Sequence, residues 1–436
     1  MGKITRHPLF ATADALKRAF AINGFTVLDD GVSSELQTTD WALSPYYKPE
    51  SIRRTPIVLE EHGEYAMRCE LITSMLPQMR GTLPIKSIAI GRVYDAKDAP
   101  FVDHLVVAGV IAQEDIEMRH LEKLFKAIAK QTYGIEASAK LELIERETYR
   151  IVVTASDTFT FGYIGKGEEI ARALLGLSNP DISMWSFTID VDSVVMHDLK
   201  LSNRSELYNP NVSFLSQFED DTPAFGDSFT ALAIDTLRKH GFQEFSGERL
   251  YEEDAYKKMN MIMESWDLNN RGFFLKEPLG SKVRIPTVRT PALQDALEAN
   301  YKAGEKTVRL FEIGQHFVSD ANGRNPELKT SLSVGAYGPG IDKKSFRAEV
   351  DSIMSDLGVS NHFFIPVTIA IPYDPTDCWV LMDERMEYLG GNFGTINKIA
   401  LDYHELGVEA FMLQIEMKPL EKKALEEFDT IPNELL

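Results

Sequence analysis

The chain has few cysteines: only Cys69 and Cys378 occur among its 436 residues. They lie far apart and no further cysteine completes a pairing pattern, so a disulfide framework and a cysteine-built zinc site are both excluded. We interpret the two as buried core thiols, because free cysteine behaves as a small hydrophobic residue. Their number is typical of a protein that works in the reducing cytoplasm.

Long apolar runs are also missing. The apolar segments are short and interrupted by charge, whereas a membrane-spanning helix needs about 20 consecutive apolar residues. The first residues, Met1 to Pro8, contain no apolar h-region, so we expect no secretory signal. These features predict a globular cytoplasmic protein that does not engage a membrane.

The chain has no basic face. Lysine and arginine total 46 against 66 aspartates and glutamates, which gives a formal net charge of −20. Proteins that bind nucleic acids usually gain much of their affinity by neutralising phosphates. The densest group of lysines, at 418–423, is interleaved with acid. The charge therefore disfavours tRNA as a partner, although a local positive groove remains compatible with it.

A short echo occurs in the two halves of the chain. Residues 89–94 read Ala-Ile-Gly-Arg-Val-Tyr and residues 312–317 read Glu-Ile-Gly-Gln-His-Phe. The length is sufficient for two domains, and 44% hydrophobic residues are enough for two packed cores. We therefore expect two copies of one domain core.

The hydrophobic patterns around the echo also repeat. In the first half we expect helices at 11–21 and 121–133, a central strand at 101–111, and hairpin strands at 151–154 and 158–164. In the second half we expect helices at 229–240, 289–303 and 346–357, and strands at 242–245, 332–338 and 388–394. Gly24, Gly134 and Gly241 are placed to end helices. Turn residues and a charge run between Asn209 and Pro223 indicate the boundary.

Several segments of the first half resemble phenylalanyl-tRNA synthetase. His7-Pro8-Leu9, a helix and then Asn23-Gly24-Phe25-Thr26-Val27 are similar to the start of the catalytic core of its α subunit. Leu83 to Tyr94 is similar to its second class II motif, and Phe187 to Met196 to its third, with 203–208 after it. The order of the segments is that of the family.

The second half resembles the catalytic-like but inactive core of the β subunit. Val288 to Leu297 with Asn300, and then Leu310 to Gly314, give the clearest match. Asp377 to Gly391 and Phe411 to Leu420 continue it. The resemblance covers residues 5–425, with no room for the family's coiled coil, editing domain or anticodon-binding domain.

The resemblance implies an α+β fold. We expect two class II synthetase-like antiparallel sheets flanked by helices and arranged as an internal pseudo-dimer. The expected domains are residues 1–210, an α-subunit-like core, and 223–436, a β-subunit-like core, with residues 211–222 as a linker.

The residues needed for adenylation are altered in this chain. Class II chemistry places arginines on the ATP phosphates, where charge accumulates. The resemblance puts Asp95 and Ser193 at the two arginine positions, and an aspartate there repels a triphosphate. Valine replaces the acidic residue of the family's His-Gln-x-Glu-Gly turn at 103–109, and Thr188 and Asp190 replace the glycine-rich start of the third motif. ATP and Mg²⁺ are therefore not supported by intact motifs.

Some side chains of the first half remain as candidates for a ligand site. Arg68 and Glu70 lie where the family contacts its substrate, and Arg92 is kept within the second motif. Arg92 and Arg68 are the weak candidates for catalysis; in a structural interpretation, both form salt bridges at strand ends. The complete set of candidate ligand-binding residues is Arg68, Glu70, Arg92, His104, Phe161, Gly162 and Gly165.

We therefore expect a diverged phenylalanyl-tRNA synthetase-like protein that binds an amino-acid-like small molecule, with conventional adenylation lost or altered. The alternative is an active enzyme that uses ATP to activate an amino acid, either as an aminoacyl-tRNA synthetase or as a tRNA-independent ligase. A structural scaffold is a third interpretation. Assembly into a homo-oligomer and binding of a protein partner are both compatible with the sequence. We expect no metal site other than Mg²⁺ with ATP.

Overall fold

The structure is a computed structural model of the whole chain. It describes residues 5–28, 36–38, 54–60, 65–79, 83–99, 101–167, 169–226, 228–261, 272–319, 326–368 and 372–429. Its contacts divide the chain into two compact units. The first unit consists of Pro8–Leu207 and Leu275–Gly280, and the second of Met1–His7, Tyr208–Phe274 and Ser281–Leu436.

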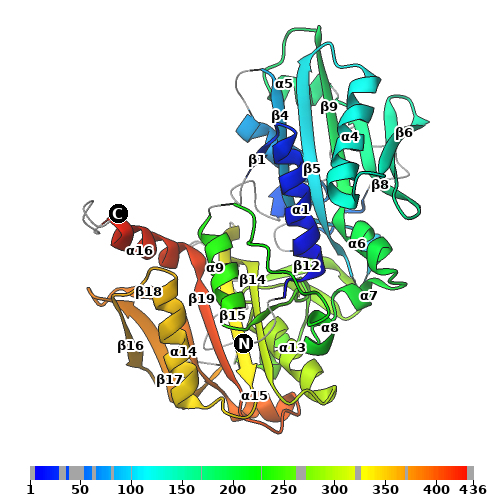
Figure 1. Cartoon of the computed structure of the whole chain (residues 1–436). Coiled ribbons are helices and arrows are strands. Elements are labelled where there is room, and N and C mark those ends of the chain that lie inside the picture. Colours follow the sequence, from blue (N-terminus) through cyan, green and yellow to red (C-terminus); the bar gives the residue numbers. More distant parts are fainter. Residues whose placement is uncertain are drawn as a thin grey trace. The chain divides into compact units, whose positions relative to one another are not determined.

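The first unit contains one large sheet and its helices (Figure 1). Its strands are β1 (Thr26–Leu28), β2 (Leu36–Thr38), β3 (Tyr65–Met67), β4 (Ile85–Tyr94), β5 (Asp103–Glu114), β6 (Ser138–Glu145), β7 (Thr148–Thr154), β8 (Thr158–Lys166) and β9 (Ile182–Asp190). Its helices are α1 (Pro8–Ile22), α3 (Ile72–Met75), η3 (Leu76–Met79), η4 (Ala96–Asp98), α4 (Met118–Tyr133), α5 (Glu169–Leu174), α6 (Val191–Leu199) and α7 (Arg204–Leu207).

The large sheet of the first unit has seven strands in the order β1-β4-β5-β9-β8-β7-β6. Only β1 runs parallel to its neighbour, β4, and the other pairs are antiparallel. Helices α1 and α4 cover one face, where Phe20, Phe125 and Phe187 pack ring against ring. Residues of α3, η3 and α5 cover the other face with an apolar cluster that includes Leu71, Ala89 and Ala108.

The second unit repeats this plan. Its strands are β10 (Gln243–Glu244), β11 (Tyr251–Glu252), β13 (Lys282–Ile285), β14 (Val308–Ser319), β15 (Pro326–Tyr337), β16 (His362–Pro366), β17 (Tyr373–Asp383), β18 (Tyr388–Ile396) and β19 (Phe411–Glu416). Its helices are α8 (Val212–Leu215), α9 (Phe229–Lys239), α10 (Ala255–Lys258), α13 (Thr290–Lys302), α14 (Lys343–Asp356), α15 (Lys398–Tyr403) and α16 (Met417–Asp429). Strand β12 (Phe273–Leu279) begins in the second unit and ends in the first.

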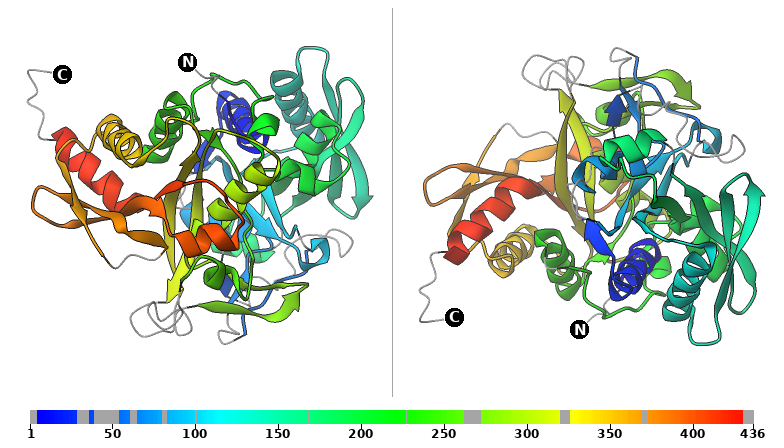
Figure 2. Two further views of the ribbon diagram at one scale, coloured as in Figure 1. Left: turned by 90° about the horizontal axis from the view of Figure 1, so that it is seen from below. Right: turned by 90° about the horizontal axis from the view of Figure 1, so that it is seen from above.

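The large sheet of the second unit has the order β10-β14-β15-β19-β18-β17-β16, which is the order of the first sheet strand for strand. The first strand, β10, is again parallel to its neighbour. Figure 2 shows α9, α14 and α16 on one side of this sheet, where they share an apolar core with Phe311 and Leu413. Helix α13 packs on the opposite face with Leu310 and Met412.

The Ile-Gly echo falls on equivalent strands, β4 and β14. In both units the glycine of the echo lies against a buried arginine. A Cβ atom on Gly91 would lie 2.7 Å from Nη2 of Arg68, and one on Gly314 would lie 2.9 Å from Nε of Arg289. The glycine is therefore required because only a residue without a side chain leaves room for the guanidinium group.

The structure confirms the predicted fold class, with two α+β units that each hold a seven-stranded sheet flanked by helices. The helix expected at 121–133 is α4, and Gly134, with a φ of 98°, ends it. The pseudo-dimer arrangement of the two sheets stays a prediction.

Residues 211–222 were expected to form a linker between the domains. In the structure this segment contains α8, and the second unit binds it directly. The backbone N–H of Val212 donates to Oδ1 of Asn300 at 2.8 Å, and Nδ2 of Asn300 donates to the carbonyl of Pro210 at 2.9 Å.

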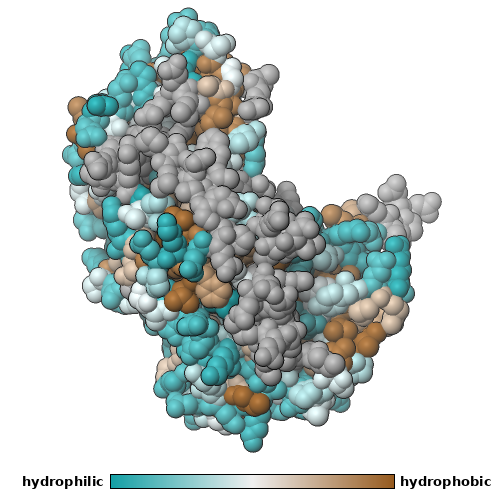
Figure 3. Space-filling view, turned by 180° about the vertical axis from the view of Figure 1, so that it is seen from behind, coloured by the Kyte–Doolittle hydropathy of each residue, from teal (hydrophilic) through white to brown (hydrophobic). Residues whose placement is uncertain are grey.

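On the face shown in Figure 3, hydrophilic residues make up most of the described surface, and apolar residues form separate patches. No helix in the described part of the chain is long and apolar enough to cross a membrane. Cys69 and Cys378 are buried, as predicted.

Candidate functional site

The two candidate catalytic arginines, Arg68 and Arg92, are both buried and both bound by the protein itself. Arg92 on β4 is 4% exposed, and its Nη1 forms an ion pair with the carboxylate of Asp103 on β5. Arg68 is 2% exposed and donates from Nε and Nη2 to the backbone carbonyl of Arg92, at 2.9 and 2.6 Å. The ion pair of Arg92 is a contact of the kind that the structural interpretation expects, whereas Arg68 binds a backbone carbonyl.

A third arginine, Arg54, lies close to another expected residue, Glu70. Nη1 of Arg54 lies 3.5 Å from Oε1 of Glu70, and Nη2 lies 3.7 Å from Oδ2 of Asp190. Both distances are long for charge-assisted hydrogen bonds. The guanidinium group of Arg54 is therefore close to two carboxylates but is not tightly held by either.

His104 on β5 joins two acidic residues. Its Nδ1 lies 3.1 Å from Oδ2 of Asp190, and its Nε2 lies 2.7 Å from Oδ2 of Asp98. Nη1 of Arg204 approaches the same Nε2 at 3.1 Å, while Nη2 of Arg204 donates to Asp192 at 2.6 Å. His104 thus contacts charged groups from β9, η4 and α7.

Asp190 lies at the centre of these contacts. It ends β9 and caps α6, accepting a hydrogen bond from the backbone N–H of Ser193 at 3.1 Å. Burial raises the pKa of Asp190, but the hydrogen bond and charge of His104 and the charge of Arg54 outweigh burial and hold that pKa well below its usual range. Asp190 is therefore an anion at any physiological pH.

We call this group the first-unit charged network. It contains more carboxylates than guanidinium groups, and its members are Arg54, Glu70, Asp98, His104, Asp190, Asp192 and Arg204.

The structure brings some of the expected site residues together and separates others. Neighbouring residues on a strand point to opposite faces and paired residues share a face. Arg92 pairs with Leu105, and Val93 pairs with His104. Arg92 and His104 therefore face opposite sides of the sheet.

The remaining expected residues lie on β8. Phe161 is buried and packs edge to face against Tyr133 of α4, with ring centroids 6.4 Å apart. A Cβ atom on Gly162 would lie 2.3 Å from the carbonyl oxygen of Thr188, and Gly165 pairs with Ser186 of β9. Phe161 is part of the core beneath α4, and Gly162 allows β8 and β9 to approach each other closely.

The two positions where the resemblance expects arginine have local structural roles. Oδ1 of Asp95 accepts the backbone N–H of Lys97 at 3.0 Å, which caps η4, and also that of Thr55 at 2.9 Å. Ser193 lies in the first turn of α6, where its backbone N–H contacts Asp190. Neither residue provides a cation to this part of the unit.

Five members of the network were not among the candidate site residues: Arg54, Asp98, Asp190, Asp192 and Arg204. Asp190 was quoted only as a departure from the glycine-rich pattern. Arg54 and Arg204 lie far along the chain from β5, and only tertiary folding brings them to His104 and Asp190. No spacing in the sequence signals these contacts.

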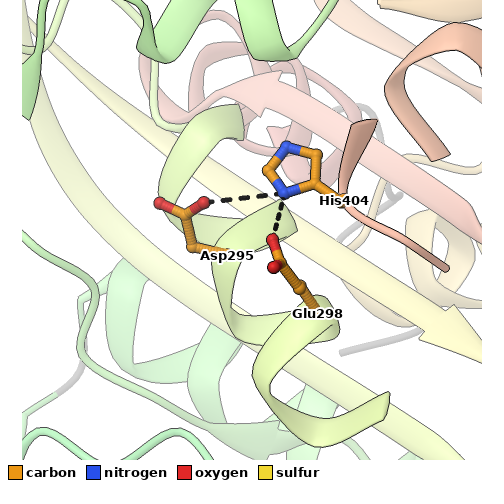
Figure 4. Close-up of side chains that lie close together, drawn as sticks. All are labelled: Asp295, Glu298 and His404. Carbon is orange, nitrogen blue, oxygen red and sulfur yellow. Dashed lines mark hydrogen bonds and ion pairs between the residues drawn. The ribbon is translucent and has the colours of Figure 1, made fainter. Parts of the chain in front are cut away.

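The second unit contains a compact group of Asp295, Glu298 and His404, drawn in Figure 4. Nδ1 of His404 on the α15 side forms an ion pair with Glu298 of α13 and lies 3.8 Å from Oδ1 of Asp295. Glu298 also pairs with Lys302. The contact of His404 with Glu298 therefore connects the end of α15 to α13, and Glu298 is also bound by Lys302.

Comparisons with known proteins match both units. Residues 1–149 match the family model described as tRNA synthetases class II core domain (F). Residues 226–417 match the model described as phenylalanyl tRNA synthetase beta chain CLM domain.

Two curated relatives are phenylalanine–tRNA ligase beta subunits. The one from Clostridium acetobutylicum is 20% identical over 214 residues, which cover 47% of this chain and 26% of that protein. The one from Clostridium tetani is 22% identical over 166 residues, which cover 38% of this chain and 20% of that protein. The matched part of this chain thus spans about a quarter or less of the length of these relatives.

Among solved structures, PylSc of Desulfitobacterium hafniense, a pyrrolysyl tRNA synthetase, aligns with a TM-score of 0.39 at 13% identity. The alignment covers 50% of this chain and 78% of that structure.

The folds and the matched models define a protein built from class II tRNA synthetase-like cores. Within that class, the predicted resemblance to phenylalanyl-tRNA synthetase is confirmed, with a class II core domain (F) in the first unit and a beta-chain core in the second.

Proposed function

We propose that this phenylalanyl-tRNA synthetase-like protein binds an amino-acid-like ligand in its first unit and does not form an adenylate by the usual chemistry. The observation that carries this proposal is the charge of the first-unit charged network. Carboxylates outnumber guanidinium groups there, and Arg92 is committed to Asp103. A triphosphate brought to this network would meet net repulsion.

The same network has the charges to bind a zwitterionic ligand, which carries both a carboxylate and an ammonium group. The guanidinium group of Arg54 is planar and binds a carboxylate through two parallel hydrogen bonds when the geometry allows. Its present contacts with Glu70 and Asp190 are long, so a ligand carboxylate can replace them at small cost. The ionised carboxylate of Asp190 then accepts the ammonium group of the same ligand.

The cofactor and the partners follow from this proposal. ATP with Mg²⁺ is not required for binding, because the ligand's own two charges supply the contacts. The names of the curated relatives include tRNA as their substrate, but the net charge of −20 argues against tRNA as a partner of this chain. We further propose that the protein acts in the cytoplasm. The alternative function is activation of an amino acid with ATP.

Thermal unfolding with a panel of amino acids tests the proposal. One amino acid or close analogue should raise the melting temperature without ATP, because a ligand at 100 times its dissociation constant stabilises by about 2.7 kcal/mol. Arg54→Gln should remove this stabilisation. Arg119→Gln is the control, since Arg119 lies exposed on α4 and pairs only with Glu117 among the described residues.

Pyrophosphate exchange separates the two functions. A diverged binding protein shows no exchange with any amino acid, whereas an activating enzyme exchanges pyrophosphate with its own substrate. Stabilisation that appears only when ATP and Mg²⁺ are present would favour the alternative.

A further inference from the structure

A cavity of about 180 Å³ lies in the second unit, between the N-terminal end of α13 and the sheet. Thr287, Val288 and Thr290 line it from the start of α13, and His316 lines it from β14. Tyr388, Gly390, Asn392, Gln414 and Glu416 line it from β18 and β19. One water molecule occupies about 30 Å³ in the liquid, so this cavity has room for a small organic molecule.

The sheet beneath α13 carries polar residues in a row. Glu312 pairs with Ser333, Ser333 with Gln414, and Gln414 with Asn392, so these four residues share one face across four strands. Two of the four, Gln414 and Asn392, line the cavity.

The first unit is apolar at two of the equivalent positions. Gly91 and Gly314 are equivalent, so Ala89 stands where the second unit has Glu312. Ala108, the partner of Ala89, stands where the second unit has Ser333. At the other two positions, those of Gln414 and Asn392, the first unit has Thr188 and Tyr163. The row therefore differs between the units at Glu312 and Ser333.

One buried polar atom in the wall of the cavity, Oγ1 of Thr290, makes no hydrogen bond within the described part of the chain. Thr290 is 2% exposed. A buried hydroxyl without a partner costs about 1–3 kcal/mol. Because Thr290 lines the cavity, a ligand placed there can supply the missing hydrogen bond.

The charge of the lining selects the kind of ligand. Among the described lining residues no lysine or arginine occurs, and Glu416, which contacts Lys329 at 3.5 Å, is the single one with a formal charge at neutral pH. Burial lowers the pKa of His316 to about 3, so its imidazole adds no positive charge. Arg289, on the same face, is already bound by both carboxylate oxygens of Glu312.

We propose that this cavity is a second ligand site, which binds a small molecule bearing a primary ammonium group. Glu416 at the mouth accepts the ammonium group, and Thr290, Asn392 and Gln414 supply hydrogen bonds to the body of the ligand. The rings of Tyr373 and Tyr388 line the same cavity, and aromatic faces attract cations. This site lies in the second unit and goes beyond the ligand site proposed for the first.

Ligand-observed NMR with phenethylamine and putrescine tests the proposal on the full chain. We expect saturation transfer to at least one of these amines and none to phenylacetate or butyrate, which carry the opposite charge. Glu416→Gln should weaken amine binding by at least about tenfold, because it removes a charge-assisted hydrogen bond.

Glu327→Gln is the matched control. Glu327 and Glu416 both contact Lys329, at 3.0 and 3.5 Å, but only Glu416 lines the cavity. The control should bind the amine like the parent protein. Absence of amine binding, binding of the carboxylates instead, or full binding by Glu416→Gln would each overturn the proposal.

The first-unit proposal is tested separately by Arg54→Gln. Loss of amine binding in Glu416→Gln together with unchanged amino acid binding would show two sites. If the second-unit proposal fails, Arg54→Gln still tests the first-unit site. If the first-unit proposal fails, Glu416→Gln still tests the second-unit site.

Discussion

Asp190 and Glu416 occupy the same position in the two units. Each lies two strands across the sheet from the glycine of the Ile-Gly echo, Asp190 from Gly91 and Glu416 from Gly314. Each also ends its strand directly before a helix. The repeated fold thus places one carboxylate at the same point of both sheets. In each unit this carboxylate is the group proposed to bind the ammonium group of a ligand.

The glycine of the second echo is predicted to be sensitive to a single methyl group. Gly314→Ala should lower the free energy of unfolding by about 1–3 kcal/mol, because the new Cβ overlaps the guanidinium group of Arg289. Urea denaturation measures the change. In a double-mutant cycle with Arg289→Met, the cost of the methyl group should fall. Equal costs in both backgrounds would show that Arg289 is not the cause.

The ion pair of Arg289 and Glu312 is fully buried, so breaking it should be costly. Burial raises the pKa of Glu312, but Arg289 and Arg249 outweigh that effect and hold it below its usual value. Arg289→Met leaves the Glu312 carboxylate buried without its main partner and should destabilise by about 3–5 kcal/mol.

The double variant Arg289→Met with Glu312→Leu should recover part of this loss, because the Glu312 carboxylate is then no longer buried without its main partner. Denaturant titrations of the single and double variants make the comparison. A double variant no more stable than Arg289→Met would argue against the ion pair.

His316 should make stability depend on pH. Burial lowers its pKa from the ordinary value of 6.5 to about 3 in the folded protein. Between these values the unfolded chain binds more protons, so stability falls as the pH falls below 6.5. The loss between pH 7 and pH 5 is about 2 kcal/mol.

His316→Asn should remove this contribution. Chemical denaturation of the parent and the variant at both pH values measures it as a smaller difference in the variant. The same pH dependence in both proteins would contradict the neutral buried imidazole.

Asn300 should fasten the segment before α8 to the second unit. Its side chain is fully buried and holds Pro210, Val212 and Ala296 by three hydrogen bonds of 2.8–2.9 Å. Asn300→Ala leaves the backbone groups of this segment without partners and should cost about 2 kcal/mol or more.

Hydrogen exchange followed by mass spectrometry is the measurement for this variant. Amides at residues 211–216 should exchange faster in Asn300→Ala than in the parent, while those of α4 in the first unit should be unchanged. Unchanged protection at 211–216 would show that other contacts hold the segment.

Local chemistry predicted much of the fold. The glycines at 24, 134 and 241 end helices as expected, each with a positive φ, because that conformation is easy only for glycine. The apolar period of α4 and the alternation of β5 are equally local. Strand β6 was not predicted, because it lies at the edge of the sheet, half of it is exposed and none of its residues is buried. Edge strands lack the one-sided burial that makes a pattern visible.

The site was less predictable. That Arg68, Arg92 and His104 bind a ligand stays a prediction, and their partners in the fold come from other elements. The contact of Arg54 with Asp190 joins residues that no periodicity connects. The cavity under α13 depends on the pairing of four strands, so its polar row becomes visible only when the register is known.

The central claim is that the first unit has kept a ligand site and lost adenylation. Pyrophosphate exchange with ATP, Mg²⁺ and each proteinogenic amino acid tests it most directly, because exchange requires the α-phosphate chemistry that an acidic network opposes. The account predicts exchange no higher than the background for every amino acid, including the one that raises the melting temperature. Exchange above background with that same amino acid would contradict it.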